Sequence, residues 1–161
     1  MKLIETDAII IGGGATGAGT LRDLSLRGVK AVLVEKNDIA SGTTGRNHGL
    51  LHSGARYAVN DLESARECIA ENAILKRIAR HCVEDTGGLF VTLPEDDPSY
   101  HGKLIEHCRY AGIPCEEISA REALRIEPNL NPMMLYALKV PDGTIDPFRL
   151  TASNVLDATE H

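Results

Sequence analysis

The first third of the chain alternates short apolar runs with a glycine-rich turn and an amphipathic stretch. Residues 7–11 end in the apolar run Ile9-Ile10-Ile11, and residues 31–34 are apolar throughout. The run Ile9-Ile10-Ile11 is typical of a parallel strand buried on both faces, and residues 31–34 predict a second strand. Residues 15–27 between them predict a helix that stops at Gly28, where a left-handed C-cap is expected. The pattern therefore predicts a strand–helix–strand unit whose two strands are parallel neighbours in one sheet.

Further along, the pattern changes to a long loop and then to mixed elements. Residues 37–57 are rich in Gly, Ser and Thr, and loops of this length in compact domains tend to be functional. Apolar residues at three- and four-residue steps predict a helix over 61–81, with Asp61 as its N-cap. The remaining pattern predicts strands over 89–93, 115–118 and 135–140, helices over 99–110 and 147–161, and a short helix opened by the capping box Ser119–Glu122.

The turn after the first strand carries the spacing G-x-G-x-x-G, in Gly12, Gly14 and Gly17. In a dinucleotide site, the first glycine permits the tight turn, the second lets the backbone approach the pyrophosphate, and the third lets the helix pack against the strand. The helix N-terminus offers N–H groups to the phosphates. Glu35, after the second strand, is the acid expected on a ribose hydroxyl, and its charge disfavours a 2′-phosphate. FAD or NAD is therefore favoured over NADP, and the alternative is a glycine-rich turn that binds no ligand.

These elements predict an α/β protein with a Rossmann-like βαβ core. We expect a dinucleotide-binding βαβ half with the long loop and a helix over residues 1–85, and the beginning of a mixed α+β substrate domain with a return helix over 86–161. A Rossmann-type sheet needs more parallel strands than this pattern supplies. We therefore expect the chain to be the N-terminal piece of a longer protein.

Composition and net charge indicate which kinds of partner and site the protein is expected to lack. The 161 residues carry a formal net charge of −6, which argues against nucleic acid as a partner. No apolar run approaches the ~20 residues that span a bilayer. The cysteines have no C-x-x-C spacing; they are Cys68, Cys82, Cys108 and Cys115. We expect them to act as small apolar residues in a reducing compartment. A metal site built from them is the lesser alternative.

Residues 40–57 contain small residues, hydroxyls, two histidines and two arginines. An NAD-dependent dehydrogenase has no general need for such a loop, whereas a flavin has a large, rigid ring that must be cradled and covered. On the segments 10–19, 22–23, 45–57 and 140–150, the chain resembles the FAD-dependent sn-glycerol-3-phosphate dehydrogenases of the D-amino-acid-oxidase-like superfamily. The resemblance is strongest to the large catalytic subunits of the anaerobic enzymes.

The resemblance implies roles for residues near the cofactor. The pyrophosphate would be held by the first glycine-rich turn, in Gly12, Gly13, Gly14, Ala15, Thr16 and Gly17. Glu35 and Lys36 would lie at the adenosine ribose. The pyrophosphate side would also contact Gly42, Thr43 and Thr44, and the isoalloxazine ring would lie over Asn47, Gly49, Leu50 and Leu51.

The resemblance also implies that His52, Arg56 and Tyr57 face the substrate. The fork of an arginine can bond two oxygens of a phosphate, and a histidine can accept a hydroxyl proton near neutral pH. The alternatives are a loop-ordering salt bridge for Arg56 and a hydrogen-bonding scaffold role for His52. We expect His81, His101 and His107 to be solvated.

The implied reaction is oxidation of sn-glycerol 3-phosphate to dihydroxyacetone phosphate, with hydride transfer to FAD. Electrons would pass through a second dehydrogenase subunit and an iron–sulfur membrane-anchor subunit to quinone. The protein would then be cytoplasmic and peripheral on the inner face of the cytoplasmic membrane. Two alternatives stay open: another flavoprotein of the superfamily, acting on a 2-hydroxy acid or an amino acid, and a non-catalytic FAD-binding fragment.

Overall fold

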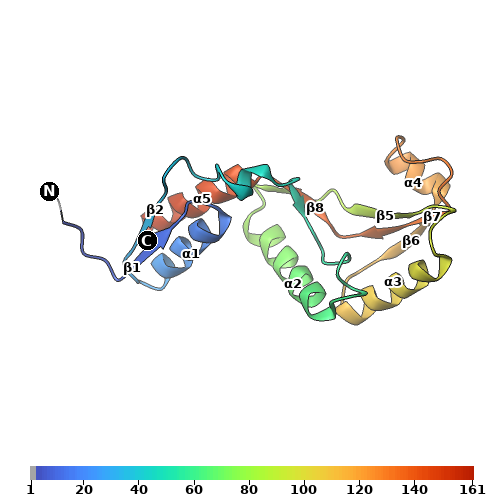
Figure 1. The fold of residues 1–161 in the computed structure, drawn as a ribbon, viewed down its shortest axis with the longest axis horizontal. Coiled ribbons are helices and arrows are strands. Elements are labelled where there is room, and N and C mark those ends of the chain that lie inside the picture. Colours follow the sequence, from blue (N-terminus) through green and yellow to red (C-terminus); the bar gives the residue numbers. More distant parts are fainter. Residues whose placement is uncertain (1–2) are drawn as a thin grey trace. The chain divides into compact units, whose positions relative to one another are not determined.

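The computed structural model describes residues 3–161, which fall into two compact units (Figure 1). The terminal unit joins the chain up to Gly49 with Ile145–His161, and the central unit comprises Leu50–Thr144. The boundaries between these two units lie after Gly49 and after Thr144, whereas the sequence predicts a domain boundary after residue 85. That boundary concerns functional domains, and it stays a prediction.

The terminal unit contains the expected strand–helix–strand motif. Strand β1 (Ala8–Ile11) and strand β2 (Ala31–Val34) are parallel neighbours, paired from Ala8↔Ala31 to Ile11↔Val34. Helix α1 (Ala15–Leu26) connects them, and Gly28 follows it with φ +72°. The Rossmann-like prediction for this segment is confirmed.

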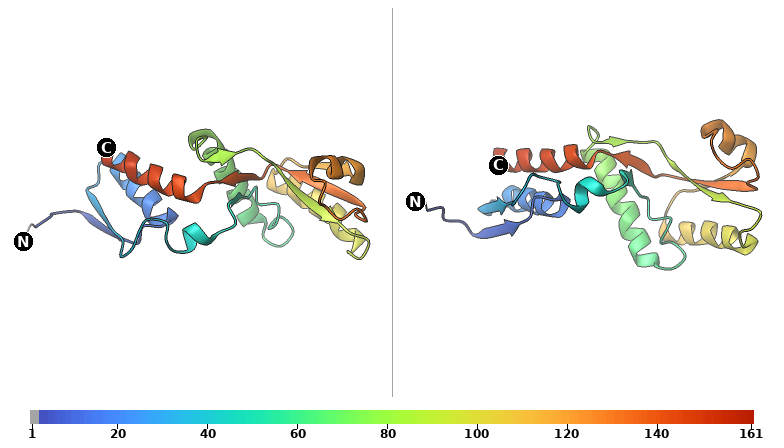
Figure 2. Two further views of the ribbon diagram at one scale, coloured as in Figure 1. Left: turned by 90° about the horizontal axis from the view of Figure 1, so that it is seen from above. Right: turned by 45° about the horizontal axis from the view of Figure 1, so that its top comes forward.

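Helix α5 (Pro147–Glu160) completes the terminal unit by packing alongside α1 (Figure 2). Asp146 caps it by accepting from the N–H groups of Phe148 and Arg149, each at 3.0 Å. Polar contacts also join the two helices. Arg22 Nε lies 2.5 Å from Asp157 Oδ2, and Ser25 Oγ donates to the Ala158 carbonyl at 2.8 Å.

One expectation about this unit is wrong: β1 is not buried on both faces. Ile9 is 66% exposed and Ile11 is 89% exposed, whereas Ile10 is half-buried on the side of α1. A parallel strand is buried on both faces only where other elements cover both sides of the sheet. Within residues 3–161, β1 is covered on the Ile10 side alone.

The central unit is built on an antiparallel sheet of β5 (Gly88–Thr92), β7 (Tyr136–Val140) and β6 (Glu116–Ser119), in that order. Its helices are α2 (Leu62–Ile78), α3 (Pro98–Ala111) and α4 (Ala120–Ile126), each within a few residues of its expected place. The N-cap at Asp61 and the capping box of Ser119 and Glu122 are both present. Helix α3 ends at Gly112, which has φ +77°.

Three very short strands were not expected from the sequence. They are β3 (Leu50–Leu51), β4 (Val83–Glu84) and β8 (Gly143–Ile145), ordered β3-β8-β4. Strands of two or three residues are too short to show an alternating pattern. A short 3₁₀ helix, η1 (Thr43–Arg46), likewise lies inside the expected loop.

Side chains alternate between the two faces of a strand. Neighbouring residues of β7 therefore belong to two different apolar clusters, one on each face of the sheet. Leu138 and Val140 pack with Leu104 and Cys108 of α3, on the side where α2 and α3 lie in Figure 1. Ala137 packs on the other side, with Ala123 of α4. Cys108 is fully buried, and burial raises the pKa of its thiol to about 11, which fits its expected role as a small apolar residue.

The expectation of a solvated His101 is also wrong. His101 is 7% exposed, its Nε2 lies 2.6 Å from Glu117 Oε2, and its Nδ1 lies 3.3 Å from Thr92 Oγ1. It shares the buried face of α3 with Leu104 and Cys108, at helical spacing. His81 is exposed, and His107 is half-buried. No helix within residues 3–161 is long and apolar enough to cross a membrane.

A matched pair of glycine substitutions tests how closely α1 packs on β1. A Cβ on Gly17 would lie 2.0 Å from the Gly12 carbonyl oxygen, whereas a Cβ on Gly19 would meet no heavy atom within 4 Å. Gly17→Ala should destabilise the complete protein by about 1–3 kcal/mol or more. Gly19→Ala should stabilise it by up to about 1 kcal/mol, because alanine is the better helix former. Denaturant unfolding measures both, and equal effects of the two variants would contradict the close approach.

Candidate functional site

The glycine-rich turn is held at the carboxyl ends of β1 and β2. Gly12 has φ +110°, a conformation that favours glycine, and its N–H donates to the Val34 carbonyl at 2.8 Å. The Gly13 carbonyl accepts from the Ala40 N–H at 2.8 Å. The turn is therefore fixed by β2 on one side and by the following loop on the other.

The N-terminus of α1 opens directly from this turn, with Gly14 as its N-cap. Gly14 has no side chain that could cap the helix, and α1, which is described in full, has no acid in its first turn. The first N–H groups of a helix lack partners inside the helix and favour an anion. This terminus, which includes Ala15, Thr16 and Gly17, thus has the chemistry to hold a pyrophosphate.

Thr44, on η1, lies beside the same terminus. Its hydroxyl accepts from the Ala15 N–H at 3.0 Å, and a Cβ on Gly14 would lie 2.9 Å from that hydroxyl. The structure therefore brings together two segments that were separately expected at the pyrophosphate, residues 12–17 and residues 42–44.

Glu35 follows β2 and reaches back to the turn. Its Oε2 accepts from the Gly13 N–H at 2.7 Å, and its Oε1 accepts from the Asn37 N–H at 2.9 Å. These two bonds, led by that from Gly13, lower the pKa of the Glu35 carboxyl below its ordinary value, and Lys36 adds to the effect. An ionised carboxylate has about four acceptor sites, so it retains capacity for a ribose hydroxyl.

Asn47 folds the loop that leads out of the terminal unit. Its Nδ2 donates to the Thr44 carbonyl at 2.8 Å, and its Oδ1 accepts from the Gly49 N–H at 2.6 Å. Gly49 has φ +66°, and its carbonyl accepts from the Ile145 N–H at 2.8 Å. The cofactor residues expected up to Gly49 lie in the terminal unit, and Leu50 and Leu51 belong to β3 of the central unit.

The expected substrate residues follow β3 in the central unit. Gly54 has φ +90°, and a Cβ there would lie 2.6 Å from the Ala65 carbonyl oxygen, so the turn sits tightly on α2. The Tyr57 N–H donates to the Gly54 carbonyl at 2.9 Å, and the side chains of Arg56 and Tyr57 are exposed. Within residues 3–161, no acid forms an ion pair with Arg56, so the loop-ordering salt bridge is not found there.

His52 meets a residue that the sequence reasoning missed. Its Nδ1 lies 3.1 Å from Oδ2 of Asp142, which is 7% exposed. Oδ1 of Asp142 accepts from the Ser53 N–H at 2.7 Å. Asp142 lies in the segment 140–150 that carried the family resemblance, but its turn chemistry alone gave it no role beyond the turn.

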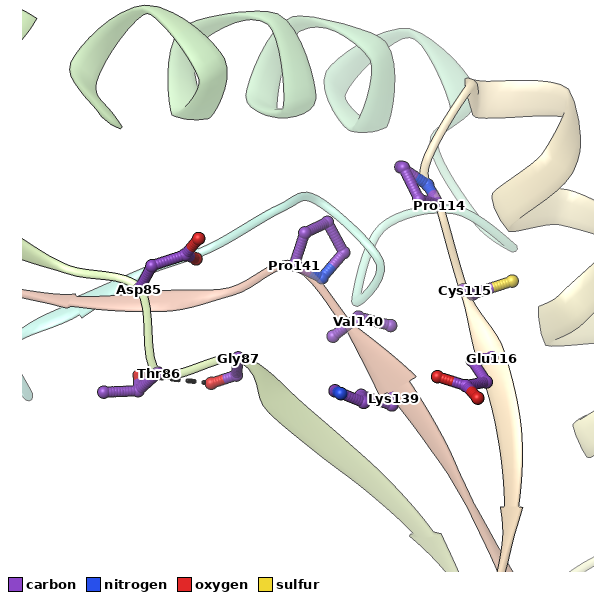
Figure 3. A pocket seen from close by; sticks show the side chains of 9 residues that line it. All are labelled: Asp85, Thr86, Gly87, Pro114, Cys115, Glu116, Lys139, Val140 and Pro141. Atoms are coloured by element: carbon purple, nitrogen blue, oxygen red, sulfur yellow. Dashed lines mark hydrogen bonds between the residues drawn. The ribbon is translucent and has the colours of Figure 1, made fainter. Parts of the chain in front are cut away.

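A cavity of about 460 Å³ opens in the central unit near the same turn (Figure 3). Figure 3 shows residues 85–87 on one side, residues 114–116 on the other and residues 139–141 between them. None of the residues expected at the cofactor or the substrate lines this cavity. It therefore adds no member to the candidate site.

The lowered pKa of Glu35 predicts a pH dependence. A folded-state pKa below the unfolded value contributes stability that is present above the ordinary value of 4.5 and is lost as the pH falls through the folded value. Glu35→Gln should therefore destabilise the complete protein at neutral pH, and the difference from wild type should shrink as the pH falls below that range. Unfolding free energies against pH measure this. Glu71→Gln, which changes an exposed acid of α2, is the control. A difference in unfolding free energy between Glu35→Gln and wild type that does not change with pH would contradict the hydrogen bonds from Gly13 and Asn37.

Comparison with known proteins places this geometry among flavoenzymes. L-proline dehydrogenase from P. horikoshii superimposes with a TM-score of 0.85 at 27% identity, over 97% of this chain and 42% of that one. A subunit of the anaerobic glycerol-3-phosphate dehydrogenase of Escherichia coli is 67% identical over 157 residues, 98% of this chain. The corresponding subunit of Haemophilus influenzae is 61% identical over 161 residues. The chain spans 29% of the length of these two curated relatives.

The model of one protein family, described as FAD dependent oxidoreductase (DAO), matches residues 7–161. The match covers the glycine-rich turn, Glu35, the loop to Tyr57 and the segment around Asp142. FAD, the cofactor expected from the sequence, is confirmed by this family. The chain belongs to the DAO family of FAD-dependent oxidoreductases.

Proposed function

We propose that the chain is part of an enzyme that oxidises sn-glycerol 3-phosphate to dihydroxyacetone phosphate with FAD. The observation that carries this proposal is the 67% identity to the anaerobic glycerol-3-phosphate dehydrogenase subunit of Escherichia coli across 98% of the chain. The aligned region includes the stretch from His52 to Tyr57, the part of the sequence expected to face the substrate. The bound flavin supplies the hydride acceptor, and the protein supplies position and charge.

The terminal unit would hold the adenosine diphosphate part of FAD. The N–H groups at the start of α1 face the pyrophosphate in this proposal, with Thr44 beside Gly14 closing the turn. The ionised carboxylate of Glu35 accepts from a ribose hydroxyl in addition to the Gly13 N–H. Gly42 and Thr43 border the same site. The charge of Glu35 opposes a 2′-phosphate, which agrees with FAD.

The central unit would supply the substrate groups. Arg56 is exposed, and no described acid neutralises it, so its guanidinium can pair with the phosphate of the substrate. His52 accepts the proton of the C2 hydroxyl as the hydride leaves C2. Tyr57 belongs to the same segment, and its hydroxyl donates a further hydrogen bond to the substrate. In this arrangement the pairing of Arg56 with the phosphate selects the substrate, and His52 acts as the base.

The names of these relatives describe them as subunits, which supports the existence of partner proteins for this chain. We propose a second dehydrogenase subunit and an iron–sulfur membrane-anchor subunit that passes electrons to quinone. The assembled enzyme would then be peripheral on the inner face of the cytoplasmic membrane. Co-purification of the complete protein from detergent-solubilised membranes with an iron–sulfur protein tests this assembly.

The rival is a superfamily enzyme that acts on an amino acid or a 2-hydroxy acid. The fold likeness to L-proline dehydrogenase keeps this alternative open, because an arginine can pair with a carboxylate as well as with a phosphate. The identity to that enzyme is much lower than the identity to the glycerol-3-phosphate dehydrogenase subunits. Glycerol 3-phosphate is therefore the first substrate to test.

Substitution of Arg56 tests the phosphate contact. A charged hydrogen-bonded pair contributes about 1.5–3 kcal/mol, so Arg56→Ala in the complete enzyme should raise KM for sn-glycerol 3-phosphate by roughly 10- to 150-fold. Arg56→Lys should recover part of this loss, because an ammonium lacks the two-pronged contact. Steady-state kinetics and the flavin-to-protein ratio are measured together. Arg77→Ala, which removes an arginine of α2, is the charge-matched control.

Two outcomes would count against the role of Arg56. Unchanged kinetics with intact flavin would place Arg56 outside the substrate site. Lost flavin with normal turnover per bound flavin would make Arg56 a structural residue of the loop.

A further inference from the structure

The carboxylate of Asp142 is buried, and both of its oxygens are used by one short segment of chain. Oδ1 accepts from the Ser53 N–H at 2.7 Å, and Oδ2 lies 3.1 Å from His52 Nδ1. Asp142 stands 90 residues from His52 in sequence, on the turn between β7 and β8. A buried carboxylate with two such partners is well placed to orient a ring.

The two segments that meet here are held by further contacts from α2. Asn72, which is 2% exposed, donates to the Leu51 carbonyl at 3.2 Å and to the Pro141 carbonyl at 3.3 Å. Lys76 Nζ donates to the Pro141 carbonyl at 2.8 Å and to the Asp142 carbonyl at 3.3 Å, and it also pairs with Asp85. Asn72 and Lys76 thus tie the backbone on each side of the carboxylate to one helix.

Strand pairing fixes the same place. Leu51 pairs with Gly143 in the β3–β8 ladder, so the residues just before His52 and just after Asp142 are in register. A Cβ on Gly88 would lie 2.9 Å from the Cβ of Asp142, which leaves the aspartate little room to move. The His52–Asp142 contact is therefore set by the backbone rather than by two flexible side chains.

The chemistry of this contact selects one form of the ring. An ionised carboxylate only accepts hydrogen bonds, so the nitrogen that faces it must carry a proton. With the proton on Nδ1, the neutral His52 ring carries its lone pair on Nε2. A carboxylate at Nδ1 also stabilises the ring once Nε2 has taken up a second proton.

We propose that Asp142 is a positioning residue that holds His52 in the Nδ1–H form, with Nε2 as the atom that accepts the proton of the substrate hydroxyl. This inference rests on the proposed function of His52 as the base. Asp142 itself does not contact the substrate in this proposal. It acts by orienting the imidazole and by stabilising the imidazolium.

The test is Asp142→Asn in the complete, FAD-loaded enzyme. The amide oxygen of asparagine can still accept from the Ser53 N–H, while its NH₂ group turns toward His52 Nδ1 and favours the opposite ring form. The kcat for sn-glycerol 3-phosphate should fall by about 10²–10⁴-fold, the range for loss of a positioned base. KM and the flavin-to-protein ratio should stay near those of wild type.

Asp85→Asn is the matched control. The Asp85 side chain is 76% exposed, it pairs with Lys76 near the same turn, and it has no part in the proposed site. This variant should keep the kcat of wild type. An equal loss of kcat in Asp85→Asn and Asp142→Asn would assign the effect to the turn as a whole and overturn the proposal.

A spectroscopic readout separates positioning from folding. The ¹⁵N shifts of the imidazole, assigned by comparison with His52→Gln, report which ring nitrogen of His52 carries the proton. Nδ1–H is expected in wild type and Nε2–H in Asp142→Asn. Nε2–H in wild type, an unchanged kcat in Asp142→Asn, or joint loss of flavin and kcat in an Asp142→Asn variant that still folds would each overturn the proposal.

Failure of the proposed function would look different. In that case the wild-type enzyme would not reduce its flavin with sn-glycerol 3-phosphate, while the ring-form difference between wild type and Asp142→Asn would persist. If Asp142→Asn does not fold, the ring form of His52 in wild type decides the matter by itself.

Discussion

The backbone of α1 approaches the end of β1 so closely at Gly17 that a Cβ there would lie 2.0 Å from the Gly12 carbonyl oxygen. This approach aims the first turn of α1, and hence its N–H groups, at the space beyond the two strand ends. The same approach sets the turn through Gly13 and Gly14. Glu35 is tied to that turn by the 2.7 Å bond from Gly13, and Thr44 by the 3.0 Å bond from Ala15. The features that suit a dinucleotide therefore depend on one steric constraint.

A second carboxylate organises the central unit as Glu35 organises the terminal unit. Glu35 accepts from two backbone N–H groups, and Asp142 accepts from the Ser53 N–H while it faces the His52 ring. In both places a carboxylate that is distant in sequence fixes a loop of small residues, and ionised acceptors make hydrogen bonds stronger than neutral ones. The DAO family match over residues 7–161 covers both places.

The sequence predicted the elements whose signals are local. The fingerprint glycines, the Asp61 cap and the Ser119 capping box depend on near neighbours, and these elements lie within a few residues of their expected places. The contacts that required tertiary structure were missed. Exposure of Ile9 and Ile11 depends on what covers a sheet face, burial of His101 depends on the phase of α3, and the role of Asp142 depends on a contact across 90 residues.

Anaerobic reduction of the flavin in the complete protein tests the central claim most directly, because it needs no electron acceptor and no partner protein. The FAD-loaded enzyme is mixed with sn-glycerol 3-phosphate, and in parallel with L-proline and glycine, while the absorbance of the oxidised flavin is followed. Bleaching by sn-glycerol 3-phosphate alone is the result that the proposed substrate site predicts. Bleaching by either amino acid, with none by sn-glycerol 3-phosphate, would contradict it and assign the site to amino-acid oxidation.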